Sequence, residues 1–143
     1  KIKIFPHTTA KLVCGIFKGD KMKFYFPENY GALGDGKNDD SRALQSAIDE
    51  AEKNGGGTVV LESGKTYYSS SVIMKKNVEL HLQKGSVLKA TSDINGYFRP
   101  CDFINDETNT LIGNPVTGKP SFAFIYAYKA DNAAITGPPL ISL

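Results

Sequence analysis

The feature that most limits the fold of this chain is a change of hydrophobic period at three consecutive glycines, residues 55–57. Before them, apolar residues recur at the spacing of one helix face. After them, apolar and polar residues alternate in short segments that end in turns. No second helical segment separates these strands, so a repeated strand–helix–strand fold is excluded. The sequence predicts one helix followed by many short strands.

The helix is expected near residues 40–54, with a single apolar stripe. Asp39 or Asp40 would cap its N-terminus and oppose the positive end of the helix dipole, and Lys53 suits its C-terminus. The glycines would end it, because glycine enters the left-handed conformation without strain. The stripe consists of Ala43, Leu44, Ala47, Ile48 and Ala51. We expect it to contact Val59, Leu61 and the Val78-Leu80-Leu82 strand.

The strands after the helix are short and closely spaced. In the segment 78–82, apolar residues alternate with polar ones, so one face is buried and His81 points outward. The other strands are expected at 58–61, 66–68, 72–74 and 86–90, after strands at 12–17 and 24–26. Residues 31–40 are predicted to form a glycine-rich turn, 91–121 a long excursion, and 122–128 a further strand.

One internal repeat, an echo of the pattern of one segment in a later one, indicates a solenoid. The segment from Asn132 to Ile141 repeats the pattern from Asn77 to Leu88: an asparagine, an alternating apolar run, a glycine and a second apolar pair. In a parallel β-helix each coil buries its inward side chains against the next coil, so such a protein needs many coils.

Composition excludes several classes of protein. The chain has 143 residues, with 41% hydrophobic and 22% charged residues, as expected for one globular domain. Its net charge of +2 and its two arginines, Arg42 and Arg99, argue against a nucleic-acid partner. No apolar run has the length of a membrane span or of a signal peptide. Residues 1–22 are a leader or linker of uncertain structure.

Several motifs have simpler structural explanations than a binding site. The segment from Gly31 to Asn38 differs from a phosphate-binding loop in its last residue, and the acids after it would repel an anion. Lys37 stands where a calcium-binding loop starting at Asp35 needs an oxygen ligand. Cys14 and Cys101 have no metal-ligand spacing, and unpaired thiols are favoured over a disulfide. No metal or cofactor is expected.

The candidate catalytic side chains also lack partners in the sequence. The acid pairs Asp39/Asp40 and Asp106/Glu107 are adjacent in the chain and would not flank one glycosidic bond, so helix capping and loop solvation explain them. His7 and His81 have no evident partner for acid–base chemistry. Four tyrosines can stack on sugar rings, but core or lateral packing is favoured for them: Tyr67, Tyr68, Tyr126 and Tyr128.

Two stretches carry a resemblance to a known family. The first stretch resembles the N-terminal cap of pectin-degrading right-handed β-helix proteins. It comprises the run Asn29–Gly36, the triplet Asn38-Asp39-Asp40, the helix beginning Ala43-Leu44-Gln45 and the segment GGGTVVLESGKTY. The segments VIMKKNVELHLQKGSVLKATSD and IYAYKADNAAITG resemble polygalacturonase-type glycoside hydrolases of family 28. The resemblance covers about Lys23 to Gly137.

The resemblance implies an all-β fold, a right-handed parallel β-helix, with residues 23–143 as its N-terminal cap and first coils. It also implies a secreted or periplasmic hydrolase, without cofactor, that cleaves α-1,4-galacturonosyl or related bonds in pectic polysaccharide by inverting acid–base catalysis. The family's motifs Asn-Thr-Asp, Asp-Asp, Gly-His-Gly and Arg-Ile-Lys are absent in their proper context, and the family order places them beyond residue 143. No catalytic, cofactor-binding or metal-binding residue is therefore assigned.

Two alternatives to this hypothesis stay open. The chain can be a non-catalytic carbohydrate-binding or tailspike-like β-helix module, or a structural cap that closes the solenoid end. We expect the chain alone to be inactive and to self-associate through its exposed last coil.

Overall fold

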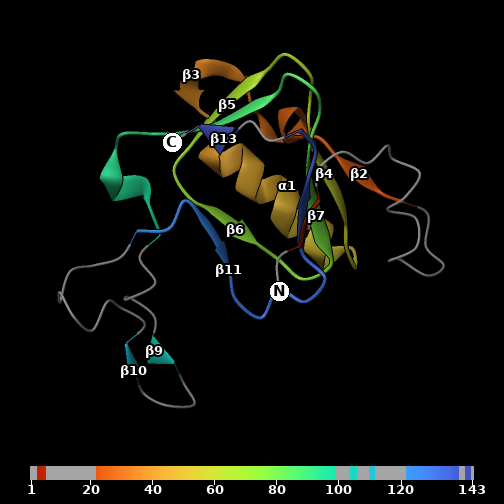
Figure 1. Cartoon of the computed structure of the whole chain (residues 1–143), viewed down its shortest axis with the longest axis vertical. Coiled ribbons are helices and arrows are strands. Elements are labelled where there is room, and N and C mark those ends of the chain that lie inside the picture. The colour runs from red at the N-terminus through yellow and green to blue at the C-terminus, as the bar shows by residue number, and fades with distance from the viewer. Residues whose placement is uncertain are drawn as a thin grey trace.

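The computed structural model describes residues 22–98 and 122–138, together with the backbone of short strands at 3–5, 104–105, 110–111 and 141–142. In this described part of the chain, three parallel sheets pack with one α-helix (Figure 1). No helix among the described residues is long and apolar enough to cross a membrane.

The first sheet has five strands, which lie in the order β1 (Lys3–Phe5), β12 (Ala134–Thr136), β7 (Val78–Leu82), β4 (Gly57–Leu61) and β2 (Phe24–Tyr25). The second sheet has the order β13 (Ile141–Ser142), β8 (Val87–Ala90), β5 (Thr66–Ser69) and β3 (Asp35–Asp39). The third sheet pairs β11 (Ile125–Ala127) with β6 (Val72–Met74). All pairs in these sheets are parallel.

The chain visits the three sheets in turn, which is the path of a parallel β-helix. One coil runs β4, β5, β6; the next runs β7, β8, β11; and β12 and β13 begin another. The predicted internal echo is confirmed, because β12 lies on β7 and Ile141 pairs with Leu88. The predicted excursion separates β8 from β11 and contains η3 (Ile94–Gly96) and the antiparallel pair β9 (Ile104–Asn105) and β10 (Thr110–Leu111).

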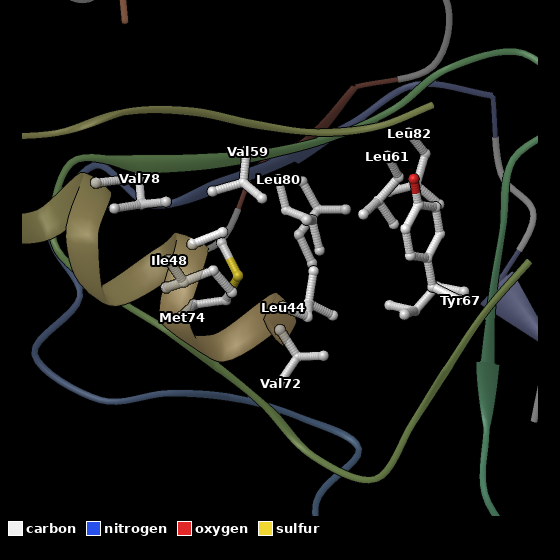
Figure 2. Close-up of a cluster of buried hydrophobic side chains, with 14 of the residues drawn as sticks. Leu44, Ile48, Val59, Leu61, Tyr67, Val72, Met74, Val78, Leu80 and Leu82 are labelled. Atoms are coloured by element: carbon white, nitrogen blue, oxygen red, sulfur yellow. The ribbon is translucent and has the colours of Figure 1, made fainter. Parts of the chain in front are cut away.

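The helix α1 (Ser41–Lys53) lies within one residue of its predicted bounds and buries the whole predicted stripe. Its Leu44 and Ile48 are fully buried and point at the inward side chains of β4 and β7 (Figure 2). The expected packing is therefore confirmed, with one hydrophobic cluster joining the stripe to Val59, Leu61, Val78, Leu80 and Leu82. Burial of this area is the main source of stability for the first coils.

The ends of α1 differ in detail from the prediction. Asp40 is the N-cap residue, but its carboxylate makes no capping hydrogen bond. The carboxylate of Asp39 accepts from the amide of Ser41 at 2.9 Å. At the other end the helix passes through Asn54 to Gly55, whose φ of 90° is left-handed, as the glycine run predicted. Lys53 lies in the last turn as expected.

The corner between the third and first sheets repeats from coil to coil. Asn77 and Asn132 both adopt left-handed backbone conformations, with φ of 59° and 60°. The side-chain amide of Asn132 donates to Oδ1 of Asn77 at 3.0 Å, so the two corners stack. These are the two asparagines that began the echoed segments in the sequence.

Some predicted elements are corrected. Residues 31–40 are not turn alone, because β3 (Asp35–Asp39) pairs with β5 through Asp35–Thr66 and Asp39–Tyr68, with an irregular register between them. The strand expected at 122–128 is shorter, Ile125–Ala127. The strand expected at 12–17 lies outside the described residues, as do His7, Cys14, Cys101, Asp102, Asp106 and Glu107.

Candidate functional site

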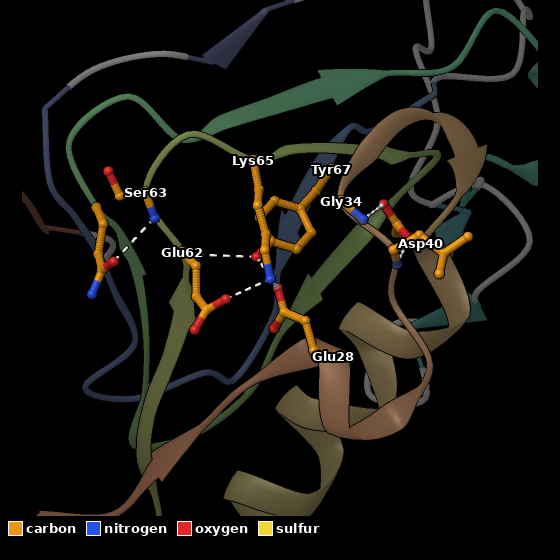
Figure 3. Close-up of polar contacts among 9 residues, drawn as sticks. Glu28, Gly34, Asp40, Glu62, Ser63, Lys65 and Tyr67 are labelled. Atoms are coloured by element: carbon orange, nitrogen blue, oxygen red, sulfur yellow. Dashed lines mark hydrogen bonds and ion pairs between the residues drawn. The ribbon is translucent and has the colours of Figure 1, made fainter.

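A cluster of charged and hydroxyl groups joins the segment before α1 to the turn between β4 and β5 and to β5 itself (Figure 3). Glu28 comes from η2 (Pro27–Tyr30), Lys65 from the turn between β4 and β5, and Tyr67 from β5. One carboxylate oxygen of Glu28, Oε1, accepts from Lys65 Nζ at 2.8 Å and from the hydroxyl of Tyr67. Lys65 also pairs with Glu62, whose amide donates to the Tyr67 hydroxyl at 3.0 Å.

The electrostatics of this cluster favour a role in stability over a role in catalysis. Burial works to raise the pKa of Glu28, but hydrogen bonds from Lys65 and Tyr67 outweigh it and hold the pKa below its usual value. Burial and the hydrogen bond to Glu28 raise the pKa of Tyr67 far above its usual value. Hydrogen bonds to Glu28 and Glu62 raise the pKa of Lys65. The charges are therefore fixed at neutral pH, and Tyr67 cannot act as a base.

In the glycine-rich loop before α1, backbone amides donate hydrogen bonds to carboxylates of the same segment, those of Asp35 and Asp40. The buried carboxylate of Asp40 accepts from the amides of Leu33 at 2.7 Å and Gly34 at 3.2 Å (Figure 3). Asp35 in turn accepts from the amides of Lys37 and Asn38, both at 2.9 Å, and these hydrogen bonds lower its pKa. This geometry agrees with the rejection of a phosphate site, since a carboxylate occupies the place of the anion.

A second polar group lies on the outward face of the first sheet. Glu79 of β7 is 4% exposed, and its two oxygens accept from Thr58 of β4, at 3.0 Å, and Thr136 of β12. The ring Nδ1 of His81 lies 2.7 Å from the Thr136 hydroxyl and 3.8 Å from the Glu79 carboxylate. Three successive coils thus bring together a carboxylate, two hydroxyls and an imidazole.

The outward direction of His81 was predicted correctly, and this outer row (Thr58, Glu79, His81 and Thr136) gives its ring hydrogen-bonding neighbours that the sequence did not reveal. Thr136 has one hydroxyl proton and gives it to Glu79, so its oxygen accepts from Nδ1–H of His81. In the neutral ring the lone pair then lies on Nε2, and the His81 side chain is 29% exposed. The contact with Thr136 therefore fixes the orientation of the imidazole on the outward face of the sheet.

The four tyrosines divide between the core and the surface. Tyr67 is fully buried, and the ring of Tyr126 packs against that of Phe98 at an angle of 43°, with centroids 4.5 Å apart, as the packing interpretation predicted. Tyr68 lies under the ammonium of Lys89, 5.5 Å from its ring centroid. Hydrogen bonds from Thr91 and the Ser92 backbone lower its pKa. Tyr128 is 49% exposed, and the ammonium of Lys129 lies over its ring, 5.3 Å from the centroid.

Neither polar group has the form of a glycosidase acid–base pair. Such a pair needs two carboxyl groups facing one bond across a space for water. Glu28 is held by Lys65, and Glu79 is buried with both oxygens occupied. The described residues also contain no group of three side chains that could hold a metal ion. The catalytic chemistry is therefore not assigned to either group.

Several known proteins are similar to part of this chain. The chain is 35% identical over 85 residues to "Depolymerase 1, capsule KN3-specific" of Klebsiella phage KN3-1, covering 52% of this chain and 11% of that protein. It is 48% identical over 61 residues to alginate lyase 7 of Azotobacter vinelandii, covering 38% of this chain and 7% of the lyase. The chain thus spans about a tenth of the length of these relatives.

Solved structures of polysaccharide-active enzymes share its fold. The family 28 exopolygalacturonase of Yersinia enterocolitica superposes with a TM-score of 0.63 at 25% identity, over 82% of this chain and 20% of the enzyme. A hyperthermoactive exopolygalacturonase of Thermotoga maritima superposes with a TM-score of 0.65 at 22% identity, over 93% of this chain and 28% of the enzyme, and so supports the fold alone.

The family follows from a match over most of the described coils. Residues 28–122 match the family described as rhamnogalacturonase A/epimerase, pectate lyase-like. These residues include η2 from Glu28 onward, the helix α1, and the strands β3 to β8 of the parallel β-helix. This chain therefore belongs to the rhamnogalacturonase A/epimerase, pectate lyase-like family and adopts the right-handed parallel β-helix fold of its relatives.

Proposed function

We propose that this chain forms the N-terminal cap and first coils (residues 23–143) of an enzyme that hydrolyses α-1,4-galacturonosyl or related bonds in pectic polysaccharide. The catalytic aspartates lie outside residues 1–143, and the reaction inverts the anomeric centre by acid–base catalysis without a cofactor. The observation that carries the proposal is the superposition of 82% of this chain on a family 28 exopolygalacturonase at 25% identity. The enzyme acts outside the cytoplasm, in the periplasm or after secretion.

In this proposal the described residues serve stability and not bond cleavage. The helix α1 covers the apolar interior at the first coil, and the Glu28–Lys65–Tyr67 cluster holds the cap on that coil. A solenoid whose catalytic groups lie on later coils depends on this covered end, because each coil is stabilised by its interfaces with the neighbouring coils. Loss of the cap would therefore reduce activity through stability.

The test compares residues 1–143 with a version of the protein extended through the following residues of its gene. With polygalacturonate, we expect release of reducing ends by the extended protein and none by residues 1–143. An inverted anomer in the first product, seen by proton NMR, identifies the hydrolase. Ultraviolet absorbance of an unsaturated product would identify a lyase, and altered uronate stereochemistry without cleavage an epimerase. Robust cleavage by residues 1–143, lost in Asp102→Asn or Asp106→Asn, would contradict the proposal.

A second candidate function is a tailspike-like module that binds a polysaccharide without cleaving it. The relative named "Depolymerase 1, capsule KN3-specific" of a Klebsiella phage, 35% identical over 85 residues, supports a capsular polysaccharide as the ligand of such a module, although its name also implies cleavage. The two candidates separate by the substrate that the extended protein recognises. Binding to an acidic capsular polysaccharide without release of reducing ends from pectic polymers would favour the module.

A further inference from the structure

The first coil meets the cap differently in the third sheet than in the other two. On the side away from the second coil, β2 pairs with β4 in the first sheet and β3 pairs with β5 in the second. In the third sheet, β6 pairs with β11 on one edge, and its other edge faces α1 (Figure 1). An open strand edge presents amides and carbonyls that can recruit a strand from another molecule. The groups that occupy this edge of β6 therefore decide whether the end of the β-helix is closed.

Ile73 is the residue of β6 whose backbone faces α1. The backbone groups of successive residues in a strand point to opposite edges. The amide of Val72 donates to the carbonyl of Phe124 at 2.7 Å, so the backbone of Val72 points to the β11 side. By alternation, the N–H and C=O of Ile73 point to the other edge, and Met74 points to the β11 side again. One residue of this three-residue strand thus carries the backbone groups that face the helix.

The side-chain amide of Gln45, on α1, meets both of these backbone groups. Its Oε1 accepts from the Ile73 amide at 3.0 Å, and its Nε2 donates to the Ile73 carbonyl at 3.1 Å. A primary amide carries one acceptor oxygen and an N–H beside it. Two residues of antiparallel strands exchange the same two hydrogen bonds when they form a hydrogen-bonded pair. The side chain of Gln45 therefore makes with Ile73 the contacts that a residue of a further strand would make.

A third hydrogen bond fixes which way this amide is turned. Nε2 of Gln45 also donates to Oδ1 of Asp49, four residues later on the same helix, at 2.9 Å. A carboxylate only accepts, so the nitrogen of Gln45 must face Asp49, and Oε1 is left to face the amide of Ile73. Both protons of Nε2 then have acceptors. Asp49 is thus a positioning residue for Gln45.

We propose that Gln45 acts as a surrogate strand, whose side-chain amide occupies the edge of β6 that faces α1 and closes the third sheet to further strands at this end. With β2 on the first sheet and β3 on the second, all three parallel sheets are then closed on the side of the cap. Gln45 lies next to Leu44 of the apolar stripe, but it serves the sheet edge and not the interior. An extended segment of another molecule cannot pair with β6 while Gln45 is in place.

Amide exchange in Gln45→Met tests the surrogate directly, because methionine keeps the length of the side chain and removes its amide. We expect exchange of the Ile73 amide to become about tenfold faster, while the amide of Val72, on the opposite edge of β6, keeps its rate. Arg42→Met is the control, since it changes an exposed residue of the same helix and should leave both rates unchanged. Equal acceleration at Val72 and Ile73, or none at Ile73, would overturn the proposal.

A second variant, Gln45→Glu, tests the proposal even if Gln45→Met does not fold. At neutral pH the new carboxylate accepts from the Ile73 amide but cannot donate to the Ile73 carbonyl, and it lies beside Asp49, which is 3.9 Å from Lys75. Protonation gives the side chain a donor and restores both hydrogen bonds with Ile73. We expect the loss of Ile73 protection relative to wild type to be large at about pH 7 and to shrink at about pH 4. Wild type at each pH is the control, because it shares the titration of Asp49. A loss that stays the same at both pH values would overturn the proposal, since side-chain shape alone would then explain it.

Discussion

The two faces of the first sheet are built from the same strands and held together by different forces. On the inward face of β7, Val78, Leu80 and Leu82 join the hydrophobic cluster under α1. On the outward face, Glu79 is equally well buried but is surrounded by hydroxyls from β4 and β12. The alternation along one strand thus separates an interior held by close packing from an outer row held by hydrogen bonds.

The direction in which a side chain of this sheet points and its exposure to solvent are therefore separate properties. Period-two alternation determines which side of the sheet a residue faces. The alternation does not determine whether the outward side is exposed to solvent, since Val60 and Glu79 both face outward and are only 4% exposed. A buried carboxylate is tolerated there because each oxygen receives a hydrogen bond.

The largest expected effect is on the inner face. Ile48→Asp would place an unpaired charge in the fully buried site between α1 and the sheet, and we expect a loss of at least about 4 kcal/mol of unfolding free energy. Urea unfolding measures the loss. The control, Ser46→Asp, adds the same charge to a partly exposed position of the same helix and should change stability by less than about 0.5 kcal/mol. Equal urea midpoints for Ile48→Asp and wild type would contradict the packing.

The next effect concerns Gly56, where the chain passes from α1 into β4. A Cβ at Gly56, whose φ is 121°, would lie 2.5 Å from the backbone oxygen of Asn77. We expect Gly56→Ala to cost about 3 kcal/mol through this clash and backbone strain. Gly55→Ala is the control, because Gly55 also has a positive φ but an added Cβ would meet nothing within 4 Å. We expect this variant to lose only about 1 kcal/mol of unfolding free energy. Equal losses in thermal unfolding would show that strain alone decides.

On the outer row we expect a smaller loss. Glu79→Ala removes the acceptor shared by Thr58 and Thr136 and should cost about 2 kcal/mol. Thr58→Val removes one donor and keeps that of Thr136, so we expect a loss of about 1 kcal/mol of unfolding free energy. The control Lys84→Ala changes an exposed turn residue after β7 and should be neutral. A Glu79→Ala protein as stable as wild type would mean that the outer row is not held by these hydrogen bonds.

Much of the fold was predictable because its signals are local. The glycine run and the apolar stripe placed α1 within one residue of its bounds, and the echoed asparagines predicted which coils stack. The strand β3 was missed because its sequence, DGKND, has no apolar alternation and pairs through the backbone. Sequence periodicity does not report such strands.

The polar groups were missed for a different reason, since their partners are distant in the chain. Glu79 receives its hydrogen bonds from residues 21 and 57 positions away, and Glu28 from residues 37 and 39 positions away. Only the closing of the coils brings these groups together. A signal was nevertheless present, because a glutamate between buried valine and leucine on a predicted strand needs partners if its side is covered.

The smallest expected effect is on the cap, and it depends on pH. The pKa of Glu28 in the folded protein lies below its ordinary value of 4.5, so its contribution to stability is present above that value. The contribution is lost as the pH falls through the folded-state pKa and the carboxylate takes up a proton in both states. Glu28→Gln should therefore cost about 1 kcal/mol near neutral pH, and the cost should shrink at acidic pH.

Urea unfolding of wild type and Glu28→Gln, at about pH 7 and again at about pH 3, measures this difference. Glu52→Gln is the control, because Glu52 is an exposed carboxylate that lies 3.8 Å from Lys75 and should contribute little at either pH. A Glu28→Gln loss that stays the same across this range would show that the carboxylate charge is not what ties the cap to Lys65. The stabilising contribution of Glu28 would then rest on the shape of the side chain and on its hydrogen bond with Tyr67.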